Sequence, residues 1–451
     1  MRIIVVGCGN VGSDLVDNLC KEGHDITVID ENEEEVNDLV NNLDVMGIVG
    51  NGASMSILEE AGVRQAQLLI AVTGSDELNL LCCLIAKKKG NCHTIARVIN
   101  PVYNKESIYL RSELGLSMII NPQQEAAREA SRLLKFPSAM QIDSFTKGRV
   151  ELIKFKIEDG SWLCNKSLKE VGRNSTANVL IAVVERGEKV FIPGGDFILR
   201  EGDAITVAGL TSKNIAFFKQ MGFPTSKVKS AMIVGGGSTA FYLASDLISM
   251  GVKVKIIERD MQRCEELSEA LPSASIIHGD GTNTSLLVEE GISNEGAFLT
   301  MTGIDEENIM LAMYAKSIGE HKLITKVHRV AYDEIIGKMD IGSVIYPKYL
   351  VSEKIVRYVR AMQNSVGSNI ETLYKMCDGK VESLEFVIGE DFPLIDVPLK
   401  DAKIKPNVLI CSINHKGTIT MAGGNSVIKP GDTVVVITTE TGFSDFKDIL
   451  A

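Results

Sequence analysis

Three glycines near the amino terminus have the spacing of a phosphate-binding turn. Gly7, Gly9 and Gly12 fit the pattern G-x-G-x-x-G, after an apolar run at residues 3–6 and before a helical pattern at residues 11–22. The first glycine permits a tight turn, the second lets the backbone approach a pyrophosphate, and the third lets the helix pack close to the strand. The helix then offers its unpaired N–H groups and positive dipole end to the phosphates. The residues predicted to bind a nucleotide here are Gly7, Cys8, Gly9, Asn10, Val11 and Gly12.

An acid follows this loop at the spacing expected for a residue that binds a ribose. Asp30 comes directly after a second apolar run at residues 26–29. Its carboxylate can accept hydrogen bonds from both ribose hydroxyls, and it would repel a phosphate on the 2′ oxygen. We therefore expect NAD(H) or another plain adenine nucleotide rather than NADP(H). The alternative is a doubly wound domain whose site is empty or degenerate.

A second glycine loop, GGGSTA, stands well past the middle of the chain. Ala240 replaces the third glycine, which the pattern tolerates. Glu258 stands where Asp30 does in the first loop, and Arg259 follows it. Because Glu258 carries the charge nearest to the ribose, we again expect a ligand without a 2′-phosphate; the alternative is a copy that only supports the first site. The residues predicted to bind here are Gly235, Gly236, Gly237, Ser238, Thr239 and Glu258.

The two loops belong to an internal duplication. TGSDELN at residues 73–79 recurs 229 residues later as TGIDEEN at residues 302–308, and GNG at residues 50–52 recurs as GDG at residues 279–281. The same offset places Arg97 opposite Lys326. This period is far longer than the 20 to 50 residues of stacking repeats, so each copy is expected to be a set of domains.

Each copy is predicted to contain two kinds of domain. Short β-branched runs alternate with helical stretches in the first part, which predicts a parallel, doubly wound sheet. The following 80 or so residues read as strands joined by tight turns, which predicts a small α+β lobe with mainly antiparallel pairing. The fold class is therefore α/β, with two tandem Rossmann-like sheets, each followed by a small α+β lobe. The four predicted domains are residues 1–138, 139–222, 228–362 and 370–451, with a linker at residues 222–226.

Polar residues follow several of the predicted parallel strands. Ligands of such sheets bind across the carboxyl ends of the strands. A cation at Arg97 or Lys326 could reach a phosphate there, or could be an ordinary surface cation at the end of a strand. The acids of SDE and IDE could merely cap the helices that follow. The further predicted site residues are Asn51, Thr73, Gly74 and Arg97 in the first copy, and Asp280, Thr302 and Lys326 in the second.

The composition and the residue counts argue against several classes of protein. The 451 residues include 59 acidic and 47 basic ones, a formal net charge of −12, which argues against a nucleic-acid binder. No apolar run approaches the ~20 residues that span a bilayer, and no signal peptide is evident, so a cytoplasmic protein is expected. The nine cysteines lack C-x-x-C spacing, so no metal site is predicted, and Cys82 and Cys83 are expected to be buried core thiols. The six histidines fall in no recognisable motif, so no catalytic residue is predicted.

Taken together, these motifs resemble a known family. The combination of VVGCGNVG with Asp30, VTGSDELN, IARV, INPQQ, IVGGGSTA with Glu258, HGDGTN, MTGIDEEN and ITKV is similar to the cytosolic nucleotide-binding subunits of the bacterial and archaeal Trk potassium-uptake system. The resemblance covers essentially the whole chain. Those subunits carry two tandem RCK (KTN) units, each a Rossmann-like lobe followed by a small lobe.

The resemblance implies a regulatory role. The family binds NAD(H), with ATP and ADP as competing or additional ligands, and its positions fall on the residues named above. It implies a homotetramer beneath a TrkH-like membrane potassium-translocating subunit, peripheral to the inner face of the cell membrane. Two positions depart from the family pattern: Asn51 replaces an aspartate, and Lys326 replaces an arginine and so loses bidentate phosphate contact. In the second copy, YPK at residues 346–348 also departs from NPQ at residues 121–123.

Three functions therefore stand at this point. The favoured one is a non-enzymatic sensor in which nucleotide binding changes the angle between lobes and gates the membrane partner. The second is an NAD-dependent oxidoreductase, which would need a general acid or base in a substrate domain. The third is a free-standing nucleotide-binding regulator of another transporter.

Overall fold

The chain forms two compact units. The computed structural model spans residues 1–451 and describes all of them except 136–139, 146–148, 176, 223–227, 329–332, 337, 338, 340, 365–369, 378, 441 and 444. One unit joins Met1–Ser131 to Lys229–Val356, and the other joins Arg132–Val228 to Arg357–Ala451. Each unit therefore combines the corresponding lobes of the two sequence repeats.

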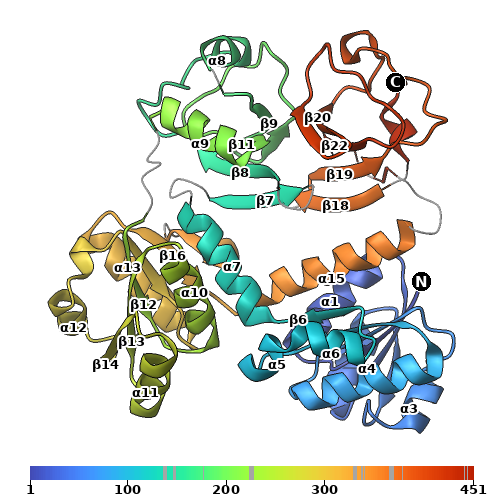
Figure 1. Ribbon diagram of the computed structural model, residues 1–451, viewed down its shortest axis with the longest axis vertical. Helices are drawn as coiled ribbons and strands as arrows, with labels where there is room; N and C mark the ends of the chain where they lie inside the picture. Colours follow the sequence, from blue (N-terminus) through green and yellow to red (C-terminus); the bar gives the residue numbers. More distant parts are fainter. Residues whose placement is uncertain are drawn as a thin grey trace. The chain divides into compact units, whose positions relative to one another are not determined.

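The first lobe is a six-stranded parallel sheet with helices on both faces (Figure 1). Its strand order is β3-β2-β1-β4-β5-β6. The strands are β1 (Arg2–Val6), β2 (Asp25–Asp30), β3 (Met46–Val49), β4 (Leu68–Ala71), β5 (His93–Arg97) and β6 (Met118–Ile120). The helices are α1 (Asn10–Lys21), α2 (Glu33–Asn42), α3 (Met55–Glu60), α4 (Asp76–Gly90), α5 (Pro101–Lys105), α6 (Ser107–Glu113) and α7 (Pro122–Lys135).

The second lobe repeats this sheet in the order β14-β13-β12-β15-β16-β17. Its strands are β12 (Ser230–Val234), β13 (Lys253–Glu258), β14 (Ser275–His278), β15 (Ala297–Thr300), β16 (Lys322–Lys326) and β17 (Ser343–Ile345). Its helices are α10 (Ser238–Ser249), α11 (Met261–Ala270), α12 (Thr284–Glu289), α13 (Asp305–Ile318), α14 (Asp333–Ile336) and α15 (Pro347–Asn364), with a 3₁₀ turn η2 (Ile292–Asn294).

The central strands explain why both lobes adopt this fold. Every residue of β4 is buried, as are four of the five in β1, because helices cover both faces of the sheet. Helix α1 turns Leu15, Val16 and Leu19 toward β1, at the spacing of one helical face. The strand order reverses between β1 and β4, and a ligand of such a sheet binds at this switch point.

The two Rossmann-like lobes contact each other through side chains of helices α1 and α7 in the first lobe and α10 and α15 in the second. Asn18 of α1 donates from Nδ2 to Ser352 Oγ of α15 at 3.1 Å. Lys354 Nζ of α15 also lies 2.6 Å from Glu125 Oε1 of α7. On α10, the Tyr242 hydroxyl accepts hydrogen bonds from the side-chain amides of Asn104 and Asn121 at 3.3 and 3.4 Å. The helix that follows each glycine loop therefore touches the other lobe.

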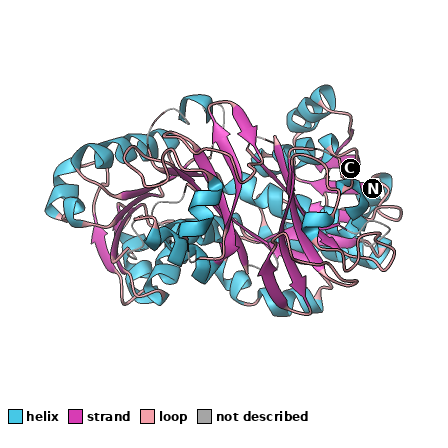
Figure 2. Cartoon of the chain, turned by 90° about the horizontal axis from the view of Figure 1, so that it is seen from above, coloured by secondary structure: helices cyan, strands magenta, loops and turns pink. Residues whose placement is uncertain are grey.

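The second unit contains two small antiparallel sheets, with strand orders β10-β9-β11-β8-β7 and β18-β19-β22-β20-β21. Most of these strands are labelled in Figure 1, and Figure 2 shows the strands of the chain in magenta and its helices in cyan. The first has β7 (Gln141–Phe145), β8 (Val150–Lys156), β9 (Leu180–Arg186), β10 (Lys189–Phe191), β11 (Ala204–Leu210), α8 (Leu168–Asn174) and α9 (Thr211–Gln220). The second has β18 (Ile370–Met376), β19 (Val381–Val387), β20 (Val408–His415), β21 (Thr418–Met421), β22 (Thr433–Thr438), η3 (Leu399–Asp401) and η4 (Phe446–Ile449). One apolar cluster joins the two sheets, with Phe145 and Leu152 packed in the same core as Val381 and Val435.

The predicted fold class is confirmed, with two parallel doubly wound sheets and two smaller α+β lobes. The four domain limits stay a prediction. The predicted boundary between residues 138 and 139, and residues 223–226 of the predicted linker, lie outside the described residues.

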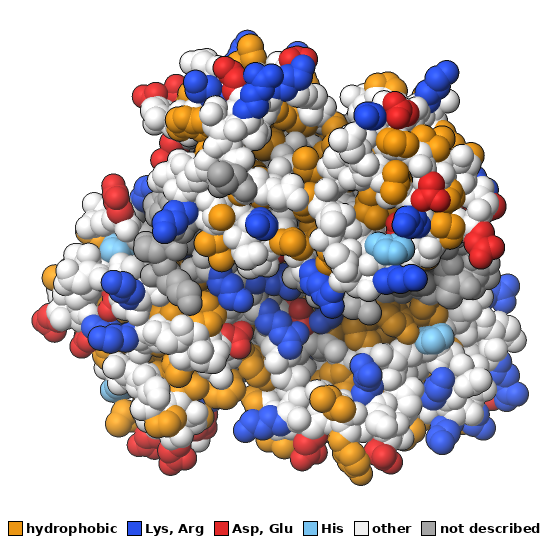
Figure 3. Space-filling model, turned by 45° about the horizontal axis from the view of Figure 1, so that its top comes forward, with side chains coloured by type: hydrophobic (Ala, Val, Ile, Leu, Met, Phe, Trp, Pro, Cys, Tyr) orange, Lys and Arg blue, Asp and Glu red, His pale blue; other side chains and the backbone are white. Residues whose placement is uncertain are grey.

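The surface mixes charges of both signs. Figure 3 shows basic and acidic side chains interspersed with apolar ones on the face in view. Among the described residues, none of the helices combines the length and the apolar character needed to cross a bilayer.

Candidate nucleotide-binding sites

The first glycine loop turns sharply between β1 and α1. Gly7 has φ of +104°, a conformation that L side chains rarely adopt, and a Cβ there would lie 2.8 Å from the backbone N of Thr73. A Cβ at Gly12 would lie 1.8 Å from the Gly7 carbonyl oxygen. The loop and the first turn of α1 are therefore in contact, as the spacing of the glycines predicts. A Cβ at Gly9 would meet only Glu35 Oε2, at 3.7 Å, so the backbone at Gly9 stays open to a ligand.

The start of α1 suits an anion. The N-cap residue is Gly9, whose backbone is extended and which has no side chain to cap the helix. The first turn, residues 10–13, contains neither Asp nor Glu. In contrast, the first turns of α2 and α4 are acidic. Negative side chains near a helix N-terminus satisfy its dipole and its free N–H groups. Helix α1 leaves both available for a phosphate.

Asp30 ties the glycine loop to the next turn. Its Oδ2 accepts a hydrogen bond from Cys8 N at 2.7 Å, and its Oδ1 accepts one from Asn32 N at 2.9 Å. Each carboxylate oxygen has a further lone pair, so both can still accept hydrogen bonds from the two hydroxyls of a ribose.

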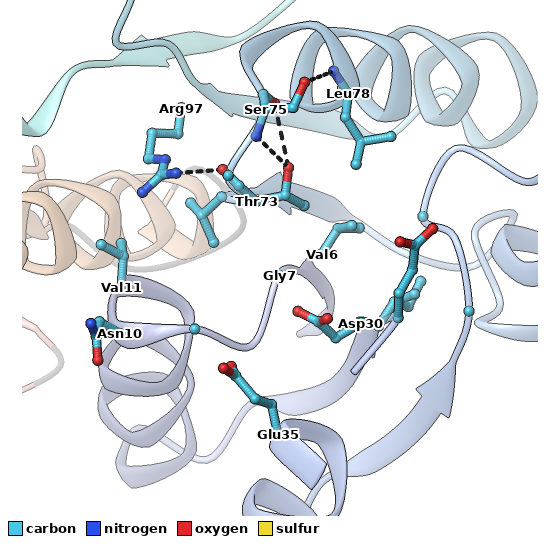
Figure 4. A pocket seen from close by; sticks show the side chains of 17 residues that line it. Val6, Gly7, Asn10, Val11, Asp30, Glu35, Thr73, Ser75, Leu78 and Arg97 are labelled. Atoms are coloured by element: carbon cyan, nitrogen blue, oxygen red, sulfur yellow. Dashed lines mark hydrogen bonds between the residues drawn. The ribbon is translucent and has the colours of Figure 1, made fainter. Parts of the chain in front are cut away.

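A cavity of about 440 Å³ lies over the loop at the switch point. In Figure 4, Asp30 and Glu35 lie on one side of Gly7, and Arg97 lies on the other side. The cavity therefore presents a carboxylate on one side of the loop and a cation on the other. The lining residues are Val6, Gly7, Gly9, Asn10, Val11, Ile29, Asp30, Glu31, Glu35, Gly50, Gly52, Val72, Thr73, Gly74, Ser75, Leu78 and Arg97.

Arg97 is held at the cavity by a polar cluster behind Thr73. Its guanidinium donates to the Thr73 carbonyl, and burial lowers its pKa while the charge of Asp76 opposes that shift. Among the described residues, none accepts a hydrogen bond from the buried Nε of Arg97. A buried guanidinium N–H without a partner favours an anionic ligand. The cavity, the bare helix start and this cation together fit a nucleotide.

Asn79 organises this cluster. Its Oδ1 accepts hydrogen bonds from Thr73 N and Oγ1, both at 2.8 Å. Its Nδ2 donates to the carbonyls of Thr73 and Arg97 at 3.2 and 3.0 Å. Asn79 is fully buried, and Asn308 makes the same four contacts in the second lobe with Thr302 and Lys326.

An Asn79→Ala variant should therefore be strongly destabilised. The change leaves buried backbone groups of Thr73 and Arg97 without partners, and each such group costs about 1–3 kcal/mol. We expect the free energy of unfolding to fall by about 2–4 kcal/mol, measured by urea denaturation. The control is Ser56→Ala, a change of an exposed residue of helix α3, for which less than about 0.5 kcal/mol is expected. Equal stability of Asn79→Ala and wild type would contradict this role.

Most residues predicted from the sequence for this site come together. Cys8, Gly12 and Asn51 are not among the lining residues. The thiol of Cys8 is buried, which raises its pKa to about 12, and Asn51 Oδ1 closes a local turn by accepting from Ala53 N. The structure adds Glu31 and Glu35, which the glycine pattern alone does not identify.

The first acids of SDE and IDE, Asp76 and Asp305, accept hydrogen bonds from backbone outside their own helices. Ser75 caps α4 by accepting from Leu78 N. The buried Asp76 instead accepts from the backbone N of Ile99 and Asn100, just beyond β5. Asp305 holds His328 N in the same way in the second lobe. These acids therefore tie the helix start to the neighbouring strand end, close to Arg97 and Lys326.

The second lobe repeats the loop geometry. Gly235 has φ of +96°, and a Cβ there would lie 2.9 Å from Thr302 N. Glu258 accepts from Gly236 N at 2.6 Å and from Asp260 N at 2.8 Å, as Asp30 does from its two partners. Helix α10, like α1, is preceded by an extended glycine, Gly237. The predicted residues Ser238 and Thr239 form the first turn of this helix.

The cationic position differs between the lobes. Lys326 is buried, and its Nζ donates to the Met301 carbonyl at 2.9 Å. Burial lowers the pKa of Lys326 to about 8, against the opposing charge of Asp305. Asp280, at the end of β14, accepts from Thr282 N and Oγ1, and these hydrogen bonds lower its pKa. Gly303 and Thr302 occupy the positions of Gly74 and Thr73.

Nucleotide affinity at the second site should therefore depend on pH. As the pH rises through about 8, Lys326 loses its proton and its attraction for phosphate, whereas the guanidinium of Arg97 stays charged. From pH 7 to pH 9.5 we expect the affinity of the second site to fall about five- to tenfold, and that of the first to change less than about twofold. Calorimetric titration of Asp30→Ala and Glu258→Ala separates the sites. Lys326→Arg should abolish the dependence; its persistence in that variant would refute the assignment.

Cys82 and Cys83 lie in the core of the first lobe. Cys82 and Cys83 are fully buried, as expected for core thiols, and burial raises their pKa values. Within the part of the chain that the structure describes, no group of three or more His, Cys, Asp or Glu side chains is placed to hold a metal ion.

Comparison with known proteins identifies both kinds of lobe. The TrkA-N domain family matches residues 3–122 and 231–347, which are the two Rossmann-like lobes. The TrkA-C domain family matches residues 152–222 and 384–451, within the two small lobes. The repeat deduced from the sequence is thus a repeat of this pair of domains.

Relatives match along almost the full length. A Trk system potassium uptake protein TrkA homolog of Archaeoglobus fulgidus is 32% identical over 436 residues, 97% of each chain. The Trk system potassium uptake protein TrkA of Halomonas elongata is 28% identical, over 97% of this chain and 95% of its own. Among solved structures, the GsuK channel bound to NAD has a TM-score of 0.64 at 16% identity, and the match covers 97% of this chain and 77% of that chain. The GsuK RCK domain has a TM-score of 0.63 at 17% identity, and the match covers 97% of this chain and 92% of that chain. The chain therefore belongs to the TrkA family, as a tandem arrangement of two TrkA-N and two TrkA-C domains.

Proposed function

We propose that this protein is a non-enzymatic, nucleotide-sensing regulatory subunit of a Trk-type potassium uptake system. It binds NAD(H), with ATP and ADP as competing or additional ligands, at the two glycine loops. Binding shifts the arrangement of the lobes, and a TrkH-like membrane potassium-translocating subunit responds. The protein is then cytoplasmic and associates with the inner face of the membrane through that partner.

One observation carries this proposal most strongly. The cavity over Gly7 combines an open loop backbone, a helix start without acids, Asp30 on one side and Arg97 on the other. These groups suit the ribose and phosphates of an adenine dinucleotide. Membership of a family whose relatives are named for potassium uptake, and a fold shared with a channel solved with NAD, support the ligand and the process.

The contacts between the Rossmann-like lobes suggest how binding is transmitted. A phosphate at the start of α1 is bound by the helix that carries Asn18, which contacts Ser352 in the other lobe. A ligand at the start of α10 is bound by the helix that carries Tyr242, which contacts Asn104 and Asn121. A nucleotide shifts an equilibrium only if it binds two arrangements with different affinity. Both helices could provide that difference, because each joins a site to the opposite lobe.

A sensor fits the lining better than an enzyme does. The described lining residues of the first cavity include no His, Cys, Lys or Tyr. Those side chains are common acid–base groups or nucleophiles near pH 7. The lining also holds the carboxylates of Asp30, Glu31 and Glu35 and the hydroxyl of Ser75, of which Asp30 and Ser75 already accept backbone hydrogen bonds. An oxidoreductase would also need a place for a second substrate beside the dinucleotide.

The homotetramer is implied by the family resemblance, and exposed apolar side chains leave surface for contacts between copies. In the first lobe, Ile108 is 84% exposed and Tyr109 is 64% exposed on α6. In the second lobe, Met310 is 65% exposed on α13. Sedimentation of the purified chain should give the mass of four copies.

The test is potassium flux in vesicles that contain the membrane subunit and this protein. NADH or ATP should change the flux at least about fivefold with the wild-type chain and should have no effect with an Asp30→Ala/Glu258→Ala variant. Asp25→Ala, at the exposed opposite end of β2, is the matched control and should respond like wild type. Flux indifferent to nucleotide, or sustained oxidation of NADH with a substrate, would contradict the proposal. Failure to co-purify with the membrane subunit would favour a regulator of another transporter.

A further inference from the structure

The two sites share the same backbone geometry around the ribose acid. Asp30 ends β2 and Glu258 ends β13, and each carboxylate accepts from the glycine loop and from the residue two positions later. Helices α2 and α11 then begin three residues after the acid. Residues at equal distance beyond the acid therefore occupy equivalent places in the two lobes.

The first lobe surrounds this position with negative charge. Glu31, next to Asp30, and Glu35, the third residue of α2, both line the cavity. The first turn of α2 also contains Glu33 and Glu34. A phosphate on the adenosine ribose would face at least three carboxylates here, and each like charge within a few ångströms weakens binding.

The second lobe reverses these charges. Arg259 replaces Glu31, and Arg263, the third residue of α11, replaces Glu35. Arg263 Nε donates to the Gly236 carbonyl at 2.8 Å, which fixes the guanidinium beside the glycine loop. Hydrogen bonds from Thr282 lower the pKa of the Asp280 carboxyl, just beyond β14. The charge of Arg259 adds to this shift by a smaller amount, so Arg259 lies close to Asp280.

Some acids remain near these arginines. Glu266 Oε2 lies 2.6 Å from an outer nitrogen of Arg263, on the exposed side of α11, and Asp260 caps that helix. Glu258 itself keeps its place. The ribose acid, the next residue and the third residue of the following helix are Asp, Glu and Glu in the first lobe and Glu, Arg and Arg in the second. Their summed formal charge is −3 in the first site and +1 in the second, a difference of four charges.

We propose that the second site accepts an adenine dinucleotide that carries a phosphate on its adenosine ribose, the NADP(H) class, and that the first site rejects it. Arginine beside the ribose is the recognised means of accommodating a 2′-phosphate, and its planar fork suits phosphate oxygens. This inference rests on the proposed function, because it names the ligand of one of its two sites. It replaces the expectation drawn from Glu258 alone.

Direct titration of NADPH and NADH against site-separated variants tests the inference. With Glu258→Ala, which leaves the first site, NADPH should bind at least about 100-fold more weakly than NADH. With Asp30→Ala, which leaves the second site, the two dissociation constants should agree within about tenfold. A second site that binds NADH but prefers it to NADPH by about 100-fold overturns the inference and leaves the proposed function intact. If the wild-type chain binds neither NADH nor NADPH, the proposed function itself is overturned.

Charge exchange provides the matched test and does not depend on the stability of Asp30→Ala. In an otherwise wild-type chain, Arg259→Glu/Arg263→Glu should weaken NADPH at least about 30-fold and NADH less than about threefold. The reverse exchange, Glu31→Arg/Glu35→Arg, alters exposed or half-exposed side chains and should let the first site bind NADPH. An unchanged NADPH to NADH ratio in both exchanged proteins, with circular dichroism that shows them folded, overturns the inference.

Discussion

Asp30→Ala is expected to weaken NADH binding at the first site by at least about 100-fold. The carboxylate is the proposed acceptor for both ribose hydroxyls, and charge-assisted hydrogen bonds contribute about 1.5–3 kcal/mol each. It also anchors the loop through Cys8 N and Asn32 N, so its removal loosens the backbone that approaches the phosphates. Isothermal titration calorimetry in a Glu258→Ala background measures the first site alone.

Two further variants separate charge from position. Asp30→Asn keeps the size of the side chain and one acceptor oxygen, so a smaller loss, about tenfold, is expected. Asp25→Ala changes an exposed acid of the same strand, whose side chain is 71% exposed and paired with Arg2 at 3.3 Å. It should bind NADH like wild type. NADH binding by Asp30→Ala at wild-type affinity would show that the dinucleotide does not bind at this loop.

Gly12→Ala is expected to disrupt the first site more than the addition of a single methyl group suggests. The added Cβ would lie 1.8 Å from the Gly7 carbonyl oxygen, so the loop or the helix must move. Overpacking of this kind costs about 1–3 kcal/mol, which urea denaturation should detect. Because the displaced backbone is the proposed phosphate site, we also expect NADH affinity to fall at least about 100-fold.

The chain contains its own control for this prediction. The second lobe already has alanine at the equivalent position, Ala240, which is fully buried. Ala240→Gly should cost only about 1 kcal/mol, from lost helix propensity and methyl burial, and should leave binding at the second site within about twofold. If Gly12→Ala proved as mild as Ala240→Gly, the close packing of loop and helix would not govern binding.

The sequence predicted the architecture because the signals for it are local. Buried parallel strands appear as continuous apolar runs, and Gly7 and Gly12 mark contacts between residues only five apart. The duplication doubled the information, because TGSDELN and TGIDEEN predict the same turn twice. The structure shows why that motif recurs: Asn79 and Asn308 each hold the threonine and the cationic strand end together.

Other features depend on contacts that sequence spacing does not show. Nothing in SDE indicates that Asp76 bonds to backbone 23 residues later instead of capping α4. The contact of Tyr242 with Asn104 and Asn121 joins residues 138 and 121 positions apart. Glu35 lies five residues after Asp30, and Arg263 lies five residues after Glu258. An alignment of the two sequence copies past these acids would have shown the opposite charges of Glu35 and Arg263. Only the structure places Arg263 against the loop carbonyl.

The most direct test of the account is one set of calorimetric titrations. NADH, NAD, ATP and ADP are titrated into the wild-type chain, Asp30→Ala, Glu258→Ala and the double variant. We expect two sites per chain in wild type, one in each single variant and none in the double variant, because each carboxylate belongs to a separate glycine loop. Undiminished binding of all four nucleotides to the double variant would contradict it.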